Sequence, residues 1–256
     1  MPLFFVRVQM GLDNFFAKNR KVALAFSGGT DSAYLLYAGI LYGADVLPYF
    51  VKSRFQPVFE FENARRLAEQ LTVNLRVLEN DVLSDRRIVS NSANRCYFCK
   101  KRIFELLISA AVKDGCPIVA DGTNADDCFD DRPGMRVLSE LGICSPLREA
   151  GLCKAEIRSL SRKAGLLTWN MPSYSCLATR VKTDVVLSEK LLRCVEMSEN
   201  VLRDLGYEDF RIRTDGKTAR VVISQRQLER AFAEEDKIVS AVAVYFNAVS
   251  LVREGR

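Results

Sequence analysis

Histidine is missing from this chain of 256 residues. Without an imidazole, the protein cannot use Ser-His-Asp chemistry or bind a metal through histidine, so a metal ligand must be a cysteine or a carboxylate. Also missing is an apolar run of the roughly 20 residues that a membrane span requires. The first residues, MPLFFVRVQM, lack the basic leader and long apolar region of a secretory signal. We therefore expect a cytoplasmic protein with no membrane partner.

A strong excess of one charge is absent as well. Lys and Arg number 37 against 32 Asp and Glu, which gives a net charge of +5. This balance favours phosphate-bearing ligands but lacks the strong basic bias of a dedicated nucleic-acid binder, so we expect no nucleic-acid partner. The eight cysteines of a cytoplasmic chain are expected to be metal ligands, reactive thiols or small buried residues rather than disulfides.

The first part of the chain alternates between short apolar segments and helix-like periodicity, which predicts a parallel sheet with right-handed helical crossovers. Ligands of such sheets bind beyond the carboxyl ends of the strands, so the loops after Phe26, Val51 and Ala120 should converge on one site. The expected strands are 21–26, 45–51, 74–79 and 117–120, and the expected helices are about 32–42, 58–71, 100–114 and 154–165.

The pattern changes near residue 170, where we place a domain boundary. Residues 1–170 form the expected α/β domain, and residues 171–256 form a smaller α+β domain. The smaller domain is expected to contain helices at about 185–205 and 225–239, a strand pair at DFRIRTD and ARVVIS, and a terminal strand near AVAVYFN.

Residues 27–32 read SGGTDS and lie between a predicted strand and a predicted helix. The exposed amides and the positive dipole end of the helix favour an anion, and two glycines let the backbone approach it closely. Neither a Walker lysine nor GxGxxG is present, so the loop predicts a pyrophosphate site of another kind. The alternative is a purely structural role, in which the loop is a flexible turn and Asp31 or Ser32 caps the helix.

This loop resembles the PP-loop of the ATP pyrophosphatase superfamily, whose members cleave ATP between the α and β phosphates. The resemblance implies that Asp31 lies near a Mg²⁺ ion, that Lys52 lies near adenine or ribose, and that Gly122, in DGTN, closes the nucleotide site. Gly122 is alternatively a simple turn glycine. The residues implied to cradle the pyrophosphate are Ser27, Gly28, Gly29, Asp31 and Ser32.

Three cysteines have the spacing of metal ligands. Cys96 and Cys99 form a C-x-x-C pair, and Cys176 follows about 80 residues later. Such a set can hold three corners of a [4Fe–4S] cluster and leave one iron open. The spacing also fits a structural zinc with a fourth cysteine, or a redox pair beside a packed thiol. The remaining cysteines are expected to fill the core: Cys116, Cys128, Cys144, Cys153 and Cys194.

Over nearly its whole length the chain resembles the LarE family of ATP-dependent sulfur transferases, within the PP-loop (adenine nucleotide alpha hydrolase-like) fold. The resemblance runs through SGGTDS, NRCYFCK, DGTNADD, DDRPGMRVLSELGI, SPLREAGLCKAEIR, AGLLTWNMPSYSCLATR and FRIRTD. In this family, Cys176 either gives up its own sulfur or acts with two further cysteines around a cluster. Because Cys96 and Cys99 are present, we favour the cluster-bearing form.

The same comparison suggests roles for several charged residues. Arg180 and Glu199 resemble active-site positions, and an arginine near Cys176 favours its thiolate. Arg211 and Arg213 alternate on a predicted strand and are expected to bind the substrate's phosphate, unless that strand face is simply solvated. A charged loop is expected either to close over ATP or to be solvated, and it contains Asp126, Asp127, Asp130, Asp131 and Arg132.

The resemblance implies a reaction in which ATP adenylates a carboxylate of pyridinium-3,5-biscarboxylic acid mononucleotide, pyrophosphate leaves, and sulfur enters. The implied cofactors are ATP, Mg²⁺ and a [4Fe–4S] cluster, and the implied partners are sulfide or another sulfur donor and further copies of the chain in a homo-oligomer. Two alternatives stay open: a tRNA thiolase with the same loop and cysteines, and a nucleotide-binding protein without chemistry.

Overall fold

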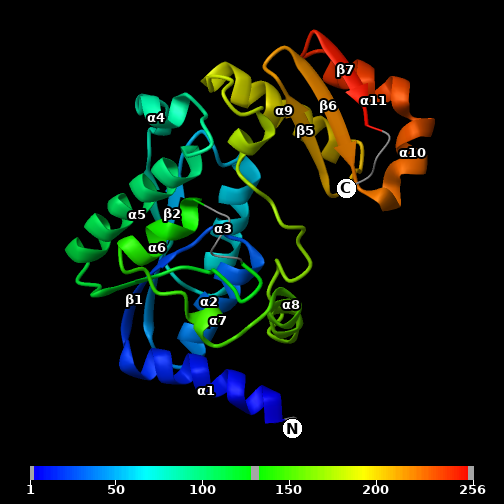
Figure 1. Ribbon diagram of the computed structural model, residues 1–256. Coiled ribbons are helices and arrows are strands. Elements are labelled where there is room, and N and C mark those ends of the chain that lie inside the picture. Colours follow the sequence, from blue (N-terminus) through cyan, green and yellow to red (C-terminus); the bar gives the residue numbers. More distant parts are fainter. Residues whose placement is uncertain (1–2, 128–132, 253–256) are drawn as a thin grey trace. The chain divides into compact units, whose positions relative to one another are not determined.

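The computed structural model describes residues 3–127 and 133–252 (Figure 1). The expected loop residues Asp130, Asp131 and Arg132, together with Cys128, lie outside this part. The chain divides into two units. Unit 1 comprises Met1–Ser53, Val58–Asn80 and Cys96–Met171, and unit 2 comprises Arg54–Pro57, Asp81–Arg95 and Pro172–Arg256. Two short segments that precede residue 170 are therefore part of unit 2.

A parallel sheet forms the centre of unit 1, as the sequence pattern predicts. Its strands are β1 (Lys21–Ala25), β2 (Asp45–Lys52), β3 (Arg76–Glu79) and β4 (Ile118–Ala120), in the order β3-β2-β1-β4. From β1 the chain builds the sheet outward to β3, and then returns to place β4 on the other side of β1. The strand order thus reverses between β1 and β4, and ligands of open α/β sheets bind at such a point.

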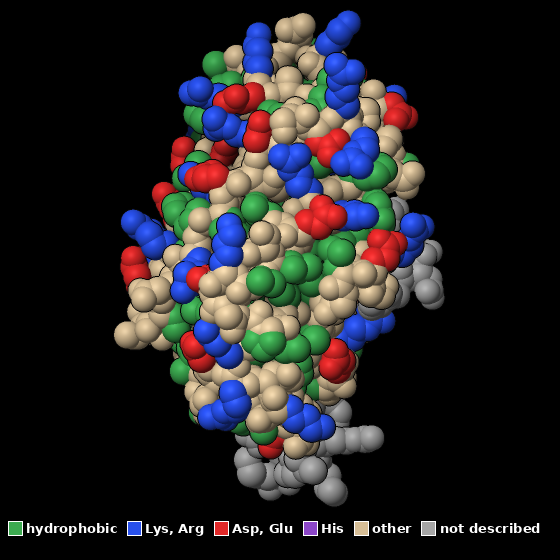
Figure 2. Space-filling view, turned by 90° about the vertical axis from the view of Figure 1, so that its left-hand side faces the viewer, with side chains coloured by type: hydrophobic (Ala, Val, Ile, Leu, Met, Phe, Trp, Pro, Cys, Tyr) green, Lys and Arg blue, Asp and Glu red, His purple; other side chains and the backbone are tan. Residues whose placement is uncertain are grey.

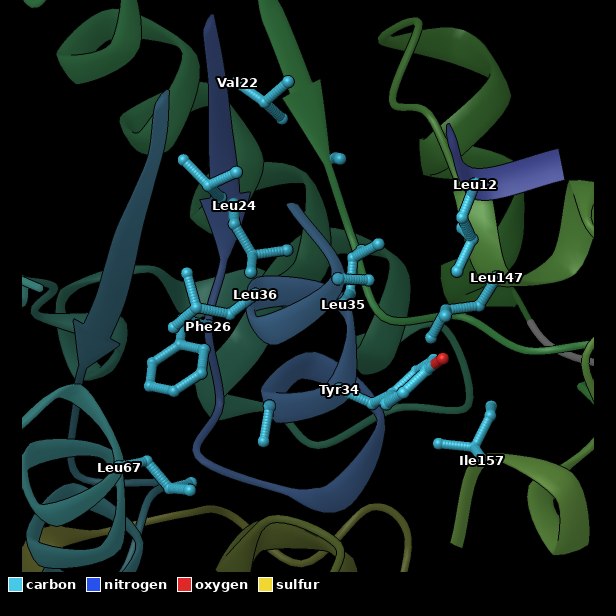
Figure 3. Packing of buried hydrophobic residues seen from close by; sticks show 14 of the residues in the cluster. Leu12, Val22, Leu24, Phe26, Tyr34, Leu35, Leu36, Leu67, Leu147 and Ile157 are labelled. Atoms are coloured by element: carbon cyan, nitrogen blue, oxygen red, sulfur yellow. The ribbon is translucent and has the colours of Figure 1, made fainter. Parts of the chain in front are cut away.

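Strand β1 faces two hydrophobic cores because its side chains alternate between the faces of the sheet. Val22 and Leu24 join a core with residues of α1 (Leu3–Lys18), α2 (Thr30–Leu41), α3 (Val58–Gln70), α7 (Pro146–Glu149) and α8 (Lys154–Lys163) (Figure 3). Ala23 joins the other core, with α5 (Arg95–Lys113) and α6 (Pro133–Glu140). Helices therefore cover both faces of the sheet, with α5 and α6 opposite α2 and α3 (Figure 1).

Unit 2 is built on a small mixed sheet. Strand β5 (Phe210–Thr214) pairs antiparallel with β6 (Thr218–Ile223), and β6 pairs parallel with β7 (Ala248–Leu251). Its longer helices are α9 (Glu189–Asp204), α10 (Leu228–Ala233) and α11 (Glu235–Val242). The shorter elements are α4 (Arg86–Val89) and the 3-10 turns η1 (Val82–Ser84), η2 (Leu177–Arg180) and η3 (Gln225–Gln227).

Two predictions for unit 2 are wrong in their boundaries. The terminal strand was expected near residues 241–247 but lies at Ala248–Leu251. The earlier residues cannot form it because Ile238 and Val242, four positions apart, are both buried on one face of α11. The expected helix at 225–239 is two helices, α10 and α11, which are separated at Glu234.

One face of the protein carries charges of both signs. On the face drawn in Figure 2, Lys and Arg side chains are interspersed with Asp and Glu side chains. Across residues 3–127 and 133–252, every helix is too short or too polar to cross a membrane.

Candidate active site

The SGGTDS loop lies at the reversal point of the sheet, directly after β1. Gly28 has a φ of 73°, and a Cβ there would lie 2.7 Å from the backbone nitrogen of Ala64 in α3. Only glycine fits this left-handed conformation and this close approach without strain. Gly29 is the N-cap of α2 and has extended backbone, with a φ of −82° and a ψ of 170°. The alternative with Asp31 or Ser32 as the N-cap is therefore wrong.

The hydroxyl groups of the loop hold it in shape. Ser27 Oγ accepts a hydrogen bond from the Gly29 amide at 3.3 Å and lies 3.2 Å from Ser32 Oγ. Thr30 Oγ1 donates to the carbonyl of Thr168 at 2.7 Å. These contacts order the loop before a ligand binds, which lowers the entropic cost of binding.

Asp31 is the acidic residue in the first turn of α2. Its Oδ2 accepts hydrogen bonds from Lys154 Nζ at 2.6 Å and from Asn124 Nδ2 at 3.4 Å. Its Oδ1 is buried and has no hydrogen-bond partner among the described residues. A buried carboxylate oxygen without a partner is costly unless a ligand satisfies it, and Mg²⁺ prefers such hard oxygens. The residues present therefore fit a Mg²⁺ ion at Asp31.

The loop after β4 packs directly on this turn. A Cβ at Gly122 would lie 2.9 Å from the backbone nitrogen of Ser32. Gly122 is not among the glycines with positive φ, so its role is close approach to α2 rather than an unusual turn conformation. Asp121 Oδ1 accepts from the Thr123 amide at 3.1 Å and from Ser145 Oγ at 2.8 Å, and these bonds fix the loop.

Lys52, expected near adenine or ribose, is the last residue of β2. Its ammonium lies 3.0 Å from Glu79 Oε1 at the end of β3 and 5.6 Å from the ring centroid of Phe61. Lys52 thus lies at the carboxyl edge of the sheet, and its contact with adenine or ribose stays a prediction.

The C-x-x-C pair opens helix α5. Cys96 is exposed and Cys99 is buried, and both belong to unit 1, whereas Cys176 belongs to unit 2. Among the described residues, no group of three Cys, Asp or Glu side chains lies together as a metal site. One turn of helix places Cys96 and Cys99 near each other on one side, which suits two ligands of one cluster. The three-cysteine cluster stays a prediction.

Two of the other cysteines have the environment of core residues. Burial raises the pKa of Cys116 and of Cys144, which disfavours their thiolates. Cys116 is buried and Cys144 is half-buried, as expected of residues that fill the core.

Cys176 immediately precedes the 3-10 turn η2 in unit 2. Arg95 Nη1 donates a hydrogen bond to Cys176 Sγ at 3.7 Å, and the Arg95 side chain is buried beside the Phe55 ring. The carbonyl of Phe55 accepts from the Leu177 amide at 2.8 Å. Residues 54–57 and 81–95 therefore supply part of the surroundings of Cys176. Arg95 was not predicted as a site residue from the sequence, although it directly precedes Cys96.

Arg180 and Glu199 form a fully buried ion pair. Arg180 Nε lies 2.8 Å from Glu199 Oε1, and both side chains have 0% exposure. Arg180 Nη1 also donates to the Ser175 carbonyl at 2.6 Å and to the Cys176 carbonyl at 3.4 Å. The arginine thus binds the backbone around Cys176, while Arg95 contacts the sulfur. Removing one partner of such a pair typically costs about 3–5 kcal/mol of stability, because the other charge stays buried.

Tyr174 and Arg211 complete this polar interior. The Tyr174 hydroxyl donates to Glu199, and burial, followed by the nearby Glu199 charge, raises the pKa of Tyr174. Arg211 is buried, and its Nη2 donates to the Ser173 carbonyl at 2.6 Å. Arg180 lies over the Tyr174 ring at 4.3 Å and Arg211 lies at 5.1 Å from its centroid. The segment before Cys176 is therefore held by buried charged groups.

Arg213 has a different environment from Arg211. It is exposed, and its Nη1 donates to the Thr179 carbonyl at 2.7 Å. It lines a cavity of about 640 Å³ in unit 2 together with Lys182 and Arg220. This cavity also presents the hydroxyl groups of Thr179, Thr183 and Thr218. The lining also includes Arg180 and one acidic residue, Asp215. Four cationic residues and several hydroxyl groups make a surface that suits a phosphate group.

The parallel sheet, the strand-order reversal and the SGGTDS turn on α2 together define a PP-loop ATP pyrophosphatase fold. No protein-family model matches the chain. The chain is 31% identical over 221 residues to the pyridinium-3,5-bisthiocarboxylic acid mononucleotide synthase of Lactiplantibacillus plantarum, an alignment that covers 86% of this chain and 80% of that protein. The chain therefore belongs to the LarE family of ATP-dependent sulfur transferases.

Two further relatives match over similar lengths. An uncharacterized protein of Methanocaldococcus jannaschii is 32% identical, over 89% of this chain and 87% of its own length. An uncharacterized protein of Synechocystis sp. is 30% identical, over 92% of this chain and 88% of its own length. The similarity thus extends through both units.

Proposed function

We propose that this protein adenylates a carboxylate of pyridinium-3,5-biscarboxylic acid mononucleotide, releases pyrophosphate and replaces a carboxylate oxygen with sulfur. The ordered PP-loop with the unpartnered Oδ1 of Asp31 is the observation that carries the ATP-dependent half of this proposal. The similarity to the pyridinium-3,5-bisthiocarboxylic acid mononucleotide synthase of Lactiplantibacillus plantarum supports this substrate.

The first step is adenylation. The amides of the SGGTDS loop and the N-terminus of α2 bind the phosphates of ATP, and Asp31 is the carboxylate that would hold Mg²⁺. A carboxylate oxygen of the substrate attacks the α-phosphorus, the bond to the β-phosphate oxygen breaks, and pyrophosphate leaves. Bound Mg²⁺ neutralises charge on the phosphates. Positioning and charge neutralisation supply most of the catalysis in such a site.

The second step is sulfur entry. A sulfur nucleophile attacks the acyl carbon of the adenylate, and AMP leaves with the oxygen that joined it to the substrate. Cys96, Cys99 and Cys176 are the residues that would hold the proposed [4Fe–4S] cluster, and the cluster would supply a binding position for external sulfide. The Arg95 guanidinium donates a hydrogen bond to the Cys176 sulfur and places a positive charge beside it. Arg180 acts as a positioning residue because it binds the carbonyls of Ser175 and Cys176, and Glu199 holds the Arg180 guanidinium.

The substrate's phosphate is proposed to bind in the cavity of Arg213. Arg213→Ala is expected to raise the KM for the mononucleotide. If one charge-assisted contact is lost, the increase should correspond to about 2 kcal/mol of binding free energy. Because Arg213 is exposed, the midpoint of chemical unfolding should change little. Arg211→Ala should behave differently and lower the unfolding midpoint, since Arg211 is buried against Ser173 and Tyr174. Equal KM values for wild type and Arg213→Ala would contradict this placement of the phosphate.

The function is tested with protein purified without oxygen and supplied with MgATP, sulfide and the biscarboxylic mononucleotide. Pyrophosphate release should depend on the mononucleotide, and mass spectrometry should show oxygen replaced by sulfur in the product. Pyrophosphate release that instead requires tRNA would identify a tRNA thiolase. Bound nucleotide without pyrophosphate release under any condition would identify a binding protein.

A further inference from the structure

Lys154 contacts the PP-loop from a distant part of the sequence. Its ammonium lies 2.6 Å from Asp31 Oδ2, and the two side chains are 27% and 21% exposed. The ion pair is thus largely shielded from water but still open on one side. Lys154 lies in the stretch SPLREAGLCKAEIR, but the sequence does not indicate its contact with Asp31, because the two residues lie 123 positions apart and Lys154 begins an amphipathic helix.

The backbone of Lys154 is held firmly. Its amide donates to Asp126 Oδ2 at 2.7 Å, and the preceding amide of Cys153 donates to Glu156 Oε2 at 2.9 Å. Helix α8, which starts at Lys154, packs along α2. The Cα of Lys154 is therefore fixed next to the start of α2, whereas its four-carbon side chain can redirect the ammonium by rotation.

A cation is needed to neutralise the negative charges of the loop and of bound ATP. The polyphosphate of ATP carries several negative charges, and the SGGTDS loop adds a carboxylate but no basic residue. P-loop proteins meet the same need with a lysine inside the loop. Among the described residues, Lys154 supplies the ammonium that is hydrogen-bonded to Asp31. The second oxygen of Asp31, which has no partner there, is the one that would accept a metal ion.

We propose that Lys154 is the pyrophosphate-binding cation of this site and that Asp31 holds it in place before nucleotide binds. When nucleotide binds, the ammonium moves from Asp31 Oδ2 to the oxygens of the β and γ phosphates, and it stays with pyrophosphate after the bond between the α-phosphorus and the bridging oxygen breaks. Asp31 Oδ1 is the oxygen that would hold Mg²⁺. This assignment rests on the proposed function, since it presumes that the loop binds ATP.

The test measures binding of inorganic pyrophosphate and MgATP by calorimetry, without turnover. Lys154→Met removes the charge and keeps most of the apolar stem, and it should weaken pyrophosphate binding about tenfold to a hundredfold. Lys154→Arg should keep most of the affinity. Lys163→Met, at the exposed end of the same helix, is the matched control and should bind like wild type.

Unchanged pyrophosphate affinity in Lys154→Met, even with a lowered unfolding midpoint, would overturn the proposal and leave the ion pair a structural feature. A second measurement uses only the wild-type protein, in case the variant does not fold. Pyrophosphate should protect the Lys154 amine from acylation, read by peptide mass spectrometry, and equal acylation with and without pyrophosphate would also overturn it. If wild type binds neither ligand, the proposed function itself fails; if wild type binds both, only the role of Lys154 is in question.

Discussion

Replacing Asp31 with Asn is expected to abolish pyrophosphate release while leaving the fold intact. Asparagine keeps the size of the side chain but removes the negative charge on which Mg²⁺ depends. In the wild-type protein, one oxygen of Asp31 is buried without a partner among the described residues, so the loss falls on an atom that has no other evident role. The measurement is substrate-dependent release of pyrophosphate at saturating ATP.

A control separates the loss of this carboxylate from a general change in charge. Asp45→Asn removes an exposed carboxylate at the first residue of β2, which is the opposite end of the strand from the site. It should release pyrophosphate at the wild-type rate. Full activity in Asp31→Asn would show that the SGGTDS turn does not bind Mg²⁺ through Asp31, and the PP-loop mechanism would have to be revised.

The second large effect concerns the three cysteines. We expect the brown colour and the activity to be lost when any one of the three cysteines is replaced, because a cluster with three protein ligands has little redundancy. The variants are Cys96→Ala, Cys99→Ala and Cys176→Ala. The wild-type protein should turn over many times when sulfide is supplied. Iron and sulfide analysis of the anaerobically purified protein, together with visible absorbance, measures the cluster directly.

A sacrificial mechanism gives the opposite pattern. The protein would be colourless, would stop after donating its own sulfur, and would show a Cys176 peptide that has lost the elements of hydrogen sulfide. Intact-mass analysis after the reaction distinguishes the two outcomes. Cys194→Ala, in α9 of unit 2, is the control and should behave like wild type. If Cys96→Ala and Cys99→Ala stay active while Cys176 is consumed, the cluster proposal is wrong.

Much of unit 1 could be predicted because its signals are local. The four strands follow from short apolar runs, and their parallel arrangement follows from the helices between them. The SGGTDS turn could be recognised because strand, glycines and helix follow one another within a few residues. Gly28 shows the physical reason: both its left-handed φ and its contact with Ala64 exclude a side chain. Such conformational and packing requirements restrict the residue type at a position, so they can be recognised in the sequence.

Boundaries in unit 2 were harder to predict, because similar residues suit different elements. The segments AVAV and AVSL both favour a strand by composition. Val242 lies in a helix because it shares a buried face with Ile238, whereas Ala248–Leu251 pairs with β6. Propensity is a weak guide here, and packing against neighbouring elements decides the outcome.

The sequence alone predicts the residue types of the candidate site, which are the SGGTDS turn, three cysteines and several arginines. Only the tertiary structure decided how the charged side chains are used. Lys154 meets Asp31 and Arg95 meets the sulfur of Cys176, and it is Arg213 rather than Arg211 that faces an open cavity. These pairings join residues far apart in the chain. The local sequence around a long flexible side chain does not predict which residue it contacts. The folded backbone brings the groups together, and the cost of leaving a buried charge unpaired then selects the contact.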